Sequence, residues 1–458
     1  MPEPTDLEPA TAAADTGPDA TAGAKADAVP PVRGRWRQLS LLGGAMLVDG
    51  SEAGLVSGLF PVIRQALGLS LGSLGVLTAA GKLVGVVAGP LWTRAAHRWS
   101  RKSVLVLATG FWGVWGIAAG FARNFTQLLL LTTLLAAGYA AAHPLVPTIL
   151  GDLFPGPSRG RATGALYGGL ALAGSALGPL IGQLAGVEDG WRWGFWIIGT
   201  LNVAFGLVLL LFFRDPGRGA AEPQLAGLAG TPRAVRPTLD RDALRSLLRI
   251  RTFAVLVVSR LLSGHLLLGS FAVVYLVDVF GFDTRTAAVV LLPLGLGYVL
   301  GTALGGFLAD WADRRSPRHG LPTALQSAQI AFAVLAYLGT QIDYGGIGPY
   351  ALLFLLMGTA QGVNPSLNRP MVLAVVPPEL RDAAFTVYVS VAEALGWAAF
   401  TLGAGLAGDA FGLRPVFLTV LVGLMLANGL FLTLLHRPWA DDVRRLQQDL
   451  DRRRTALG

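Results

Sequence analysis

The sequence predicts an all-α, polytopic membrane protein with twelve transmembrane helices in two pseudo-symmetric six-helix bundles. Hydrophobic residues make up 53% of the chain and charged residues only 14%, whereas soluble domains carry about 25% charged residues. Apolar runs of about 20 residues, the length that crosses a bilayer, recur along the sequence. Short basic clusters lie between these runs, as in the loops of membrane proteins.

Twelve segments have the length and composition of a transmembrane helix. Several contain no Asp, Glu, Lys or Arg over their whole length, and the others carry one to three embedded charges. We expect spanning helices at 39–63, 70–92, 103–122, 126–153, 162–187, 192–213, 252–280, 286–310, 321–342, 348–376, 382–408 and 413–436.

The distribution of basic residues predicts the orientation in the membrane. With both termini in the cytoplasm, the loops on the opposite side hold only Arg64, Arg123, Arg192, Arg285 and Arg414. Most of the 36 lysines and arginines then lie on the cytoplasmic side, as the positive-inside rule requires. We therefore expect a multi-pass plasma-membrane protein with cytoplasmic ends.

Composition also divides the chain into five regions. Residues 1–36 have few large apolar side chains and are expected to form a disordered cytoplasmic tail. Residues 37–213 and 252–436 are the expected six-helix bundles. Between them, 214–251 form a cytoplasmic loop that ends in an amphipathic helix, and 437–458 form a second amphipathic segment at the membrane surface.

The two expected bundles echo each other in their connecting loops. The basic loop 93–102 follows the second span, and the similar loop 306–315 follows the eighth. Likewise, the proline- and arginine-containing segments 154–162 and 376–384 follow the fourth and tenth spans. Two parallel six-span repeats are one plan of secondary transporters, in which the substrate site lies near the midplane between the halves.

At these loops the sequence resembles the major facilitator superfamily. The segment 306–315 matches the family's signature loop at Gly306, Leu308, Ala309 and Asp310 and in the arginines that follow. The resemblance implies that the loops gate the cavity, although His97, at the aspartate position of the first copy, has the alternative of being a solvated loop residue. The gating residues so implied are His97, Arg98, Arg101, Lys102, Asp310, Arg314 and Arg315.

The fifth span resembles the superfamily's antiporter motif. It carries Gly174, Gly178, Pro179 and Gly182, with Gln183 in place of the last glycine. Proline kinks a helix and small residues allow close helix contact, so the alternative is ordinary packing. The resemblance implies efflux by antiport.

Within the superfamily, the segments 55–61, 67–70, 152–155 and 214–219 resemble Spinster-type and bacterial drug-efflux members. On that alignment Glu52 stands at the position of the family's first-span aspartate. The usual arginine and glutamate of the fourth span are replaced by Thr132 and Tyr139.

Ionisable residues within the spans are the strongest site candidates, since each costs about 2.5–3.5 kcal/mol to place near mid-bilayer. Asp49 and Glu52 are three residues apart and share a helix face. Two close carboxyl groups in a low dielectric do not both ionise readily, which suits a proton carrier; the alternative is a wet cavity that attracts cations. Lys82 lies at the depth of Asp49, so we expect a structural Asp49–Lys82 ion pair.

The second half adds polar residues that we expect to line a substrate cavity. Arg260 and Glu393 have the alternative of neutralising each other as a structural pair. Three amides of the tenth span are spaced to form one polar stripe. The expected cavity residues are Tyr139, His143, Arg260, His265, Gln361, Asn364, Asn368, Arg369, Glu393 and Trp397.

The function that this pattern favours is proton-coupled efflux of an amphipathic or drug-like molecule by a monomer in the lipid bilayer. The alternatives are a facilitator or symporter that imports a polar metabolite, or a receptor that does not transport. The chain has no cysteine and no nucleotide-binding loop or nucleophile–base motif. We therefore expect no enzyme activity, no cofactor, no metal site and no nucleic-acid partner.

Overall fold

The computed structural model describes residues 34–154, 156–217, 220 and 241–457, and all secondary structure within these ranges is helical. The expected N-terminal tail lies almost wholly outside the described residues, and so does most of the expected central loop. The bounds of the helices show which of the expected spans are single helices and which are built from two.

Six spans form the first half of the described chain, and the third and fourth are each built from two consecutive helices. Their helices are α1 (Arg35–Leu67), α2 (Leu71–Arg98), α3 (Arg101–Ala108) with α4 (Val114–Ala119), α5 (Phe125–Tyr139) with α6 (Ala142–Leu153), α7 (Gly156–Gln183) and α8 (Gly190–Phe212).

The second half repeats this order. Its helices are α10 (Arg251–Leu261) with α11 (Leu268–Phe280), α12 (Thr284–Val290) with α13 (Leu292–Arg315), α14 (Gly320–Gln341), α15 (Ile347–Gly362) with α16 (Asn364–Val375), α17 (Arg381–Phe385) with α18 (Ala392–Phe411), and α19 (Leu413–Val416) with α20 (Leu424–Phe431). Two amphipathic helices, α9 (Arg241–Arg249) and α21 (Pro438–Leu457), flank it.

Eleven helical segments of the described chain are long and apolar enough to cross a membrane. The remaining expected span, 348–376, corresponds to α15 and α16, whose helix is interrupted at Val363. The interruption leaves two pieces that are each shorter than a bilayer crossing, although together they match the expected length.

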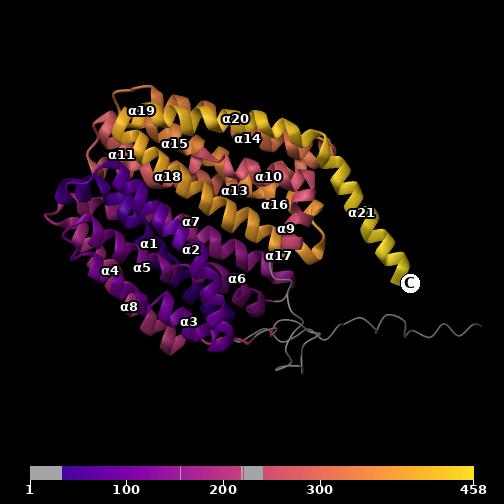
Figure 1. The fold of residues 1–458 in the computed structure, drawn as a ribbon, viewed down its shortest axis with the longest axis horizontal. Helices are drawn as coiled ribbons and strands as arrows, with labels where there is room; N and C mark the ends of the chain where they lie inside the picture. The colour runs from indigo at the N-terminus through magenta and orange to yellow at the C-terminus, as the bar shows by residue number, and fades with distance from the viewer. Residues whose placement is uncertain (1–33, 155, 218–219, 221–240, 458) are drawn as a thin grey trace, which may run out of the picture.

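The two halves lie side by side in Figure 1, the first coloured indigo to magenta and the second orange to yellow. Helices α2 and α18 pack against each other across the boundary, as do α7 with α13 and α1 with α11. The C-terminal helix α21 extends away from the bundle (Figure 1). The boundary between the halves is therefore formed by α1, α2 and α7 on one side and by α11, α13 and α18 on the other.

Polar contacts close the boundary at one end of the bundle, which we call the distal face and define by the loops at 68–70, 281–283 and 412. Both guanidinium nitrogens of Arg64 bond the carboxylate of Asp278, at 2.7 and 2.6 Å. The carboxylate of Asp409 accepts the backbone N–H groups of Leu71 and Gly72, each at 2.8 Å. Asp409 thus caps the N-terminus of α2 from the opposite half.

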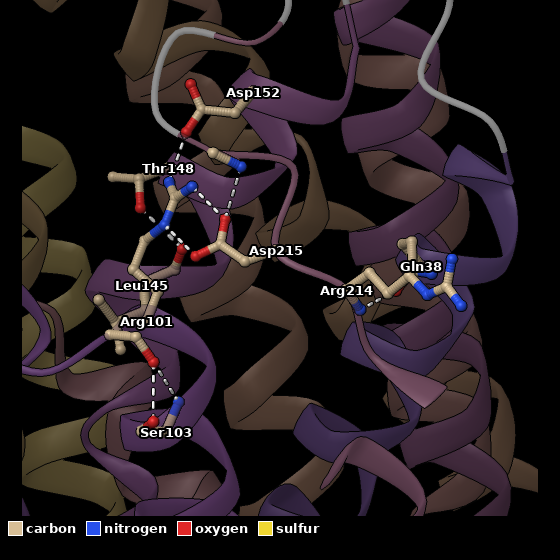
Figure 2. Close-up of polar contacts among 10 residues, drawn as sticks. Gln38, Arg101, Ser103, Leu145, Thr148, Asp152, Arg214 and Asp215 are labelled. Atoms are coloured by element: carbon tan, nitrogen blue, oxygen red, sulfur yellow. Dashed lines mark hydrogen bonds and ion pairs between the residues drawn. The ribbon is translucent and has the colours of Figure 1, made fainter. Parts of the chain in front are cut away.

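The opposite end, the termini face, contains the loops at 99–100 and 316–319. Here Arg101 forms ion pairs with both Asp152, near the end of α6, and Asp215, just after α8 (Figure 2). Its Nε donates to Asp215 at 3.0 Å, and its side chain is buried. In this structure Arg101 therefore makes its ion pairs within the first half, and its expected part in gating stays a prediction.

The other expected gating residues at the termini face are exposed or half-buried. Arg98, Asp310, Arg314 and Arg315 are exposed, and none of them forms an ion pair with another described residue. His97 is also exposed and Lys102 is half-buried. The inter-half hydrogen bonds described above, of Arg64 with Asp278 and of Asp409 with α2, lie at the distal face.

Candidate functional site

A cavity of about 460 Å³ lies within the helices of the second half, in the size range of small-molecule sites. All of its lining residues belong to that half. Eight of them are residues expected from the sequence: Arg260, His265, Gln361, Asn364, Asn368, Arg369, Glu393 and Trp397.

Three departures from regular α-helix surround this cavity. The helix is interrupted at Leu262–Ser263 and continues as a 3₁₀ turn around His265. It is interrupted again at Val363, next to Asn364, and a π-helical segment, Thr386–Val391, precedes Glu393. Irregular backbone at membrane depth is tolerated where it lines a cavity, and π-helical turns often occur at functional sites.

A chain of amide hydrogen bonds organises one wall. Gln329 donates to Asn364 at 2.6 Å, and Asn364 donates to the side-chain oxygen of Gln361 at 3.2 Å. The amide nitrogen of Gln361 contacts Nε2 of His265 at 2.7 Å. Because an amide NH₂ only donates, Nε2 accepts and the ring proton lies on Nδ1. The ring of His265 is therefore neutral, and its Nδ1 has no partner among the described residues.

Arg260 and Glu393 form an ion pair in the same cavity, so the structure brings together the two charges that were considered as a structural pair. The guanidinium also lies over the ring of Tyr388, 6.0 Å from its centroid. The Nε of Arg260 is buried without a hydrogen-bond partner in the described chain. The carboxylate of Glu393 neutralises the charge of Arg260, but the Nε–H group of Arg260 remains without an acceptor in the described chain.

A smaller cavity of about 220 Å³ is lined by both halves. It contains Glu52 and Lys82 together with Thr132 and Tyr139. It shares Trp397 with the larger cavity. The two cavities are therefore neighbours, and Lys82 of the first half contacts Trp397, which lines both of them.

Asp49 and Glu52 share a single hydrogen-bond donor that the sequence analysis did not identify. Asn202 of α8 donates its side-chain N–H groups to Asp49 at 3.2 Å and to Glu52 at 2.7 Å. All three residues are buried, and each acid keeps one oxygen without a partner among the described residues. An asparagine in the middle of a span whose one charged residue, Arg192, lies at its end is itself an intramembrane polar signal, and it could have been found.

The expected Asp49–Lys82 ion pair is absent from the described chain. Lys82 instead places its ammonium group over the ring of Trp397, 3.5 Å from the centroid. The depths of Asp49 and Lys82 along their helices matched, but Lys82 points across the boundary between the halves. The prediction of this pair was wrong because helix rotation is not readable from depth.

The expected antiporter motif also differs from its predicted packing. Gly174 and Gly178 are exposed, and an added methyl group at either would contact nothing within 4 Å. Only Gly182 makes a close contact, with Ala288 of α12 in the other half, and α7 continues as an α-helix through Pro179. His143 lies on α6, outside the lining of both cavities.

Three aromatic side chains line the larger cavity that were not among the expected cavity residues. Tyr298, Phe332 and Tyr388 line the larger cavity, and Trp397 is held by donating its indole N–H to Ser270 at 2.9 Å. Nothing in the sequence separates these aromatics from the many that face lipid. No group of three His, Asp or Glu side chains within the described ranges could hold a metal ion.

Two six-helix halves around polar, cavity-lining helix breaks define a membrane transporter. The model of the Major Facilitator Superfamily matches residues 41–401. The chain belongs to that family of transporters, which confirms the expected fold class, and it is a multi-pass membrane protein.

Curated relatives show how varied the similar transporters are. The chain is 23% identical over 375 residues to the protein spinster of Drosophila melanogaster, covering 80% of this chain and 60% of that protein. It therefore spans about three fifths of spinster's length. It is 26% identical over 319 residues to the 4-hydroxybenzoate transporter PcaK of Pseudomonas putida, covering 69% of this chain and 65% of PcaK.

It is also 27% identical over 384 residues to the chloramphenicol resistance protein of Streptomyces lividans, covering 80% of this chain and 89% of that protein. Among solved structures, a bacterial homolog of the human lysosomal transporter Spinster, in an inward-facing and occupied conformation, aligns with a TM-score of 0.70 and 21% identity. The alignment covers 91% of this chain and 98% of that one. This likeness shows the same fold.

Proposed function

We propose that this chain is a proton-coupled secondary transporter that exports an amphipathic small molecule by alternating access. It would act as a monomer in the plasma membrane, with both termini and the 214–251 segment in the cytoplasm. The distal face, closed by Arg64–Asp278 and by the Asp409 cap, would then face outward. The conformation would be one that releases or admits substrate on the cytoplasmic side.

The observation that carries the proposal is the buried acid pair. Asp49 and Glu52 share one amide donor and form no ion pair with another described residue. Two anions so placed repel each other and lose their hydration, so at least one of them holds a proton. Because Glu52 lines the cavity that reaches Trp397, it is placed to exchange that proton when the substrate site changes.

Glu52→Gln tests the proposal in proteoliposomes. We expect the wild type to accumulate labelled chloramphenicol or 4-hydroxybenzoate when a pH gradient is imposed, with matching proton flux. The variant should lose at least 90% of this accumulation but retain substrate exchange without a gradient, because only the titrating group is removed. Glu188→Gln, which changes an exposed acid, is the matched control.

Two results would contradict the proposal. Accumulation driven by pH that survives in Glu52→Gln would show that another group carries the proton. Transport that only equilibrates the two substrates in the wild type, with no response to pH, would instead support a facilitator.

A further inference from the structure

The charges that line the two cavities are not balanced. Lys82, Arg260 and Arg369 contribute three cations, whereas Glu52 and Glu393 contribute two carboxyl groups. Arg260 and Glu393 neutralise each other. Glu52 shares the amide of Asn202 with Asp49, which the proton-carrier function requires to be at least partly protonated. Two cations therefore remain.

The first of these cations is Lys82. Its ammonium group lies on the ring of Trp397, at 3.5 Å from the centroid, and it forms no ion pair with any carboxylate in the described ranges. A cation–π contact satisfies an ammonium group only on one side. Its other N–H bonds remain available where the two cavities adjoin.

The second cation is Arg369 of α16. It lines the larger cavity, is exposed, and has no ion-pair partner within the part of the chain that the structure describes. A guanidinium presents a planar fork of donors that fits the two oxygens of a carboxylate or a phosphate.

The unpartnered atoms of the larger cavity point to the same ligand chemistry. Among its lining side chains, the buried polar atoms without a partner are Nε of Arg260 and Nδ1 of His265. Both are N–H donors, since the contact with Gln361 leaves the proton of His265 on Nδ1. Buried donors without acceptors are costly, and a bound acceptor would relieve that cost.

Apolar and aromatic side chains also line this cavity. Phe332, Tyr298 and Leu294 line the same 460 Å³ cavity as the free donors. This volume accommodates one or two aromatic rings with their substituents. The cavity therefore offers donors and cations together with aromatic surface: the ring of His265 lies against that of Phe332, and Lys82 lies on Trp397.

We propose that the transported molecule is an amphipathic organic anion. Its carboxylate or phosphate would be bound by Lys82 and Arg369 and by the free N–H groups of Arg260 and His265, and its apolar body would pack against the aromatic side chains that line the cavity. The inference rests on the proposed function in taking these cavities as the transport site. An organic cation would meet two unneutralised positive charges, and a neutral molecule would leave them unpaired.

Calorimetric titration of the purified protein in detergent tests this with four probes that share one ring system. These are 2-naphthoate, 1-naphthyl phosphate, neutral 2-naphthamide and cationic 2-naphthylmethylamine. We expect at least one of the two anions to bind ten or more times more tightly than the amide and the amine. The two anionic probes distinguish a carboxylate site from a phosphate site.

Variants assign the preference to residues. Arg369→Gln and Lys82→Met should each weaken binding of the preferred anion at least tenfold and leave binding of the amide within twofold. Arg369→Lys should keep the preference for the anion, and Arg123→Gln, an exposed arginine in a distal loop, should change nothing. Thermal unfolding of each variant verifies that it is folded.

Equal or tighter binding of the amide or the amine would overturn the proposal, and so would the absence of binding by both anions. An anion preference that survives both substitutions would overturn the assignment of the residues. Binding is measured without any gradient, so it is independent of proton coupling. A protein that selects the anion but moves no protons would contradict the proposed coupling alone.

Discussion

Asn202 is the residue on which the acid pair depends, because it donates to both carboxyl groups. Asn202→Leu should lower stability by about 1.5–3 kcal/mol, the usual worth of hydrogen bonds to charged groups. It should also change the pH dependence of transport, since both acids lose their donor. Thermal unfolding in detergent and a pH profile of uptake measure the two effects.

Asn428 of α20 provides a matched control for that substitution. It is also a buried asparagine, but neither its amide nitrogen nor its oxygen has a partner in the described chain. Asn428→Leu should therefore be neutral or stabilising, because it removes a polar group that is not hydrogen-bonded. A similar loss of stability in both variants would mean that the contacts of Asn202 add nothing.

At the scale of single residues, the sequence predicts which side chains line the cavity better than it predicts which side chains they contact. The eight cavity residues of the second half were identifiable as polar or aromatic groups within apolar spans. Lys82 shows the limit, since its depth along the span was readable but the direction of its side chain was not. That direction depends on how α2 packs against α18, which no local pattern encodes.

At the scale of elements, glycines allow α13 and α15 to pack with their backbones in contact. Methyl groups at Gly297 and Gly301 would overlap the carbonyl oxygens of Leu355 and Thr359. A methyl group at Gly358 of α15 would in turn overlap the carbonyl oxygen of Leu294 in α13. Small residues at four-residue spacing are the usual means of such close approach between membrane helices.

Gly301→Ala should therefore lower the unfolding temperature, because α13 and α15 must separate to admit the methyl group. Gly306→Ala, on the same helix, should be neutral or stabilising, since nothing lies within 4 Å of its position and alanine favours a helix by about 1 kcal/mol over glycine. Thermal unfolding of the two variants in the same detergent measures the difference. Equal changes in unfolding temperature would show that the close contact between α13 and α15 does not contribute to stability.

The spans themselves were predictable from apolar length, but their interruptions were not. The break at Val363 falls just before Asn364 and Pro365, and proline is a signal for a helix boundary. The breaks at Leu262–Ser263 and at Ala140–Ala141 carry no such signal. They persist because the surrounding helices satisfy the freed backbone groups, which is a tertiary effect.

At the scale of the whole molecule, the distal closure should be in equilibrium with an open state. Because the chain has no cysteine, Thr401→Cys would introduce a single thiol that is buried against α2. Adding Arg64→Ala should raise the rate of its labelling by a maleimide roughly fivefold, the effect of about 1 kcal/mol for a partly exposed ion pair. Arg123→Ala, which removes an arginine from a distal loop, is the control.

A charge swap completes this test. Arg64→Asp combined with Asp278→Arg should bring labelling back toward the rate of the parent, because the ion pair is restored with reversed polarity. A labelling rate that does not respond to Arg64→Ala would exclude the Arg64–Asp278 pair from the closure.

The two closing contacts have unequal freedom to change during evolution. The Arg64–Asp278 contact joins two side chains, so loss of either can be compensated by exchange of the other. The contact of Asp409 joins a side chain to the main chain of Leu71 and Gly72, which keeps its N–H groups whatever non-proline residue stands there. Substitution of Leu71 therefore leaves the contact with Asp409 intact. Loss of Asp409 cannot be compensated by a substitution at 71 or 72, because the partner there is the main chain. Families of related chains should show covariation at the first contact and none at the second.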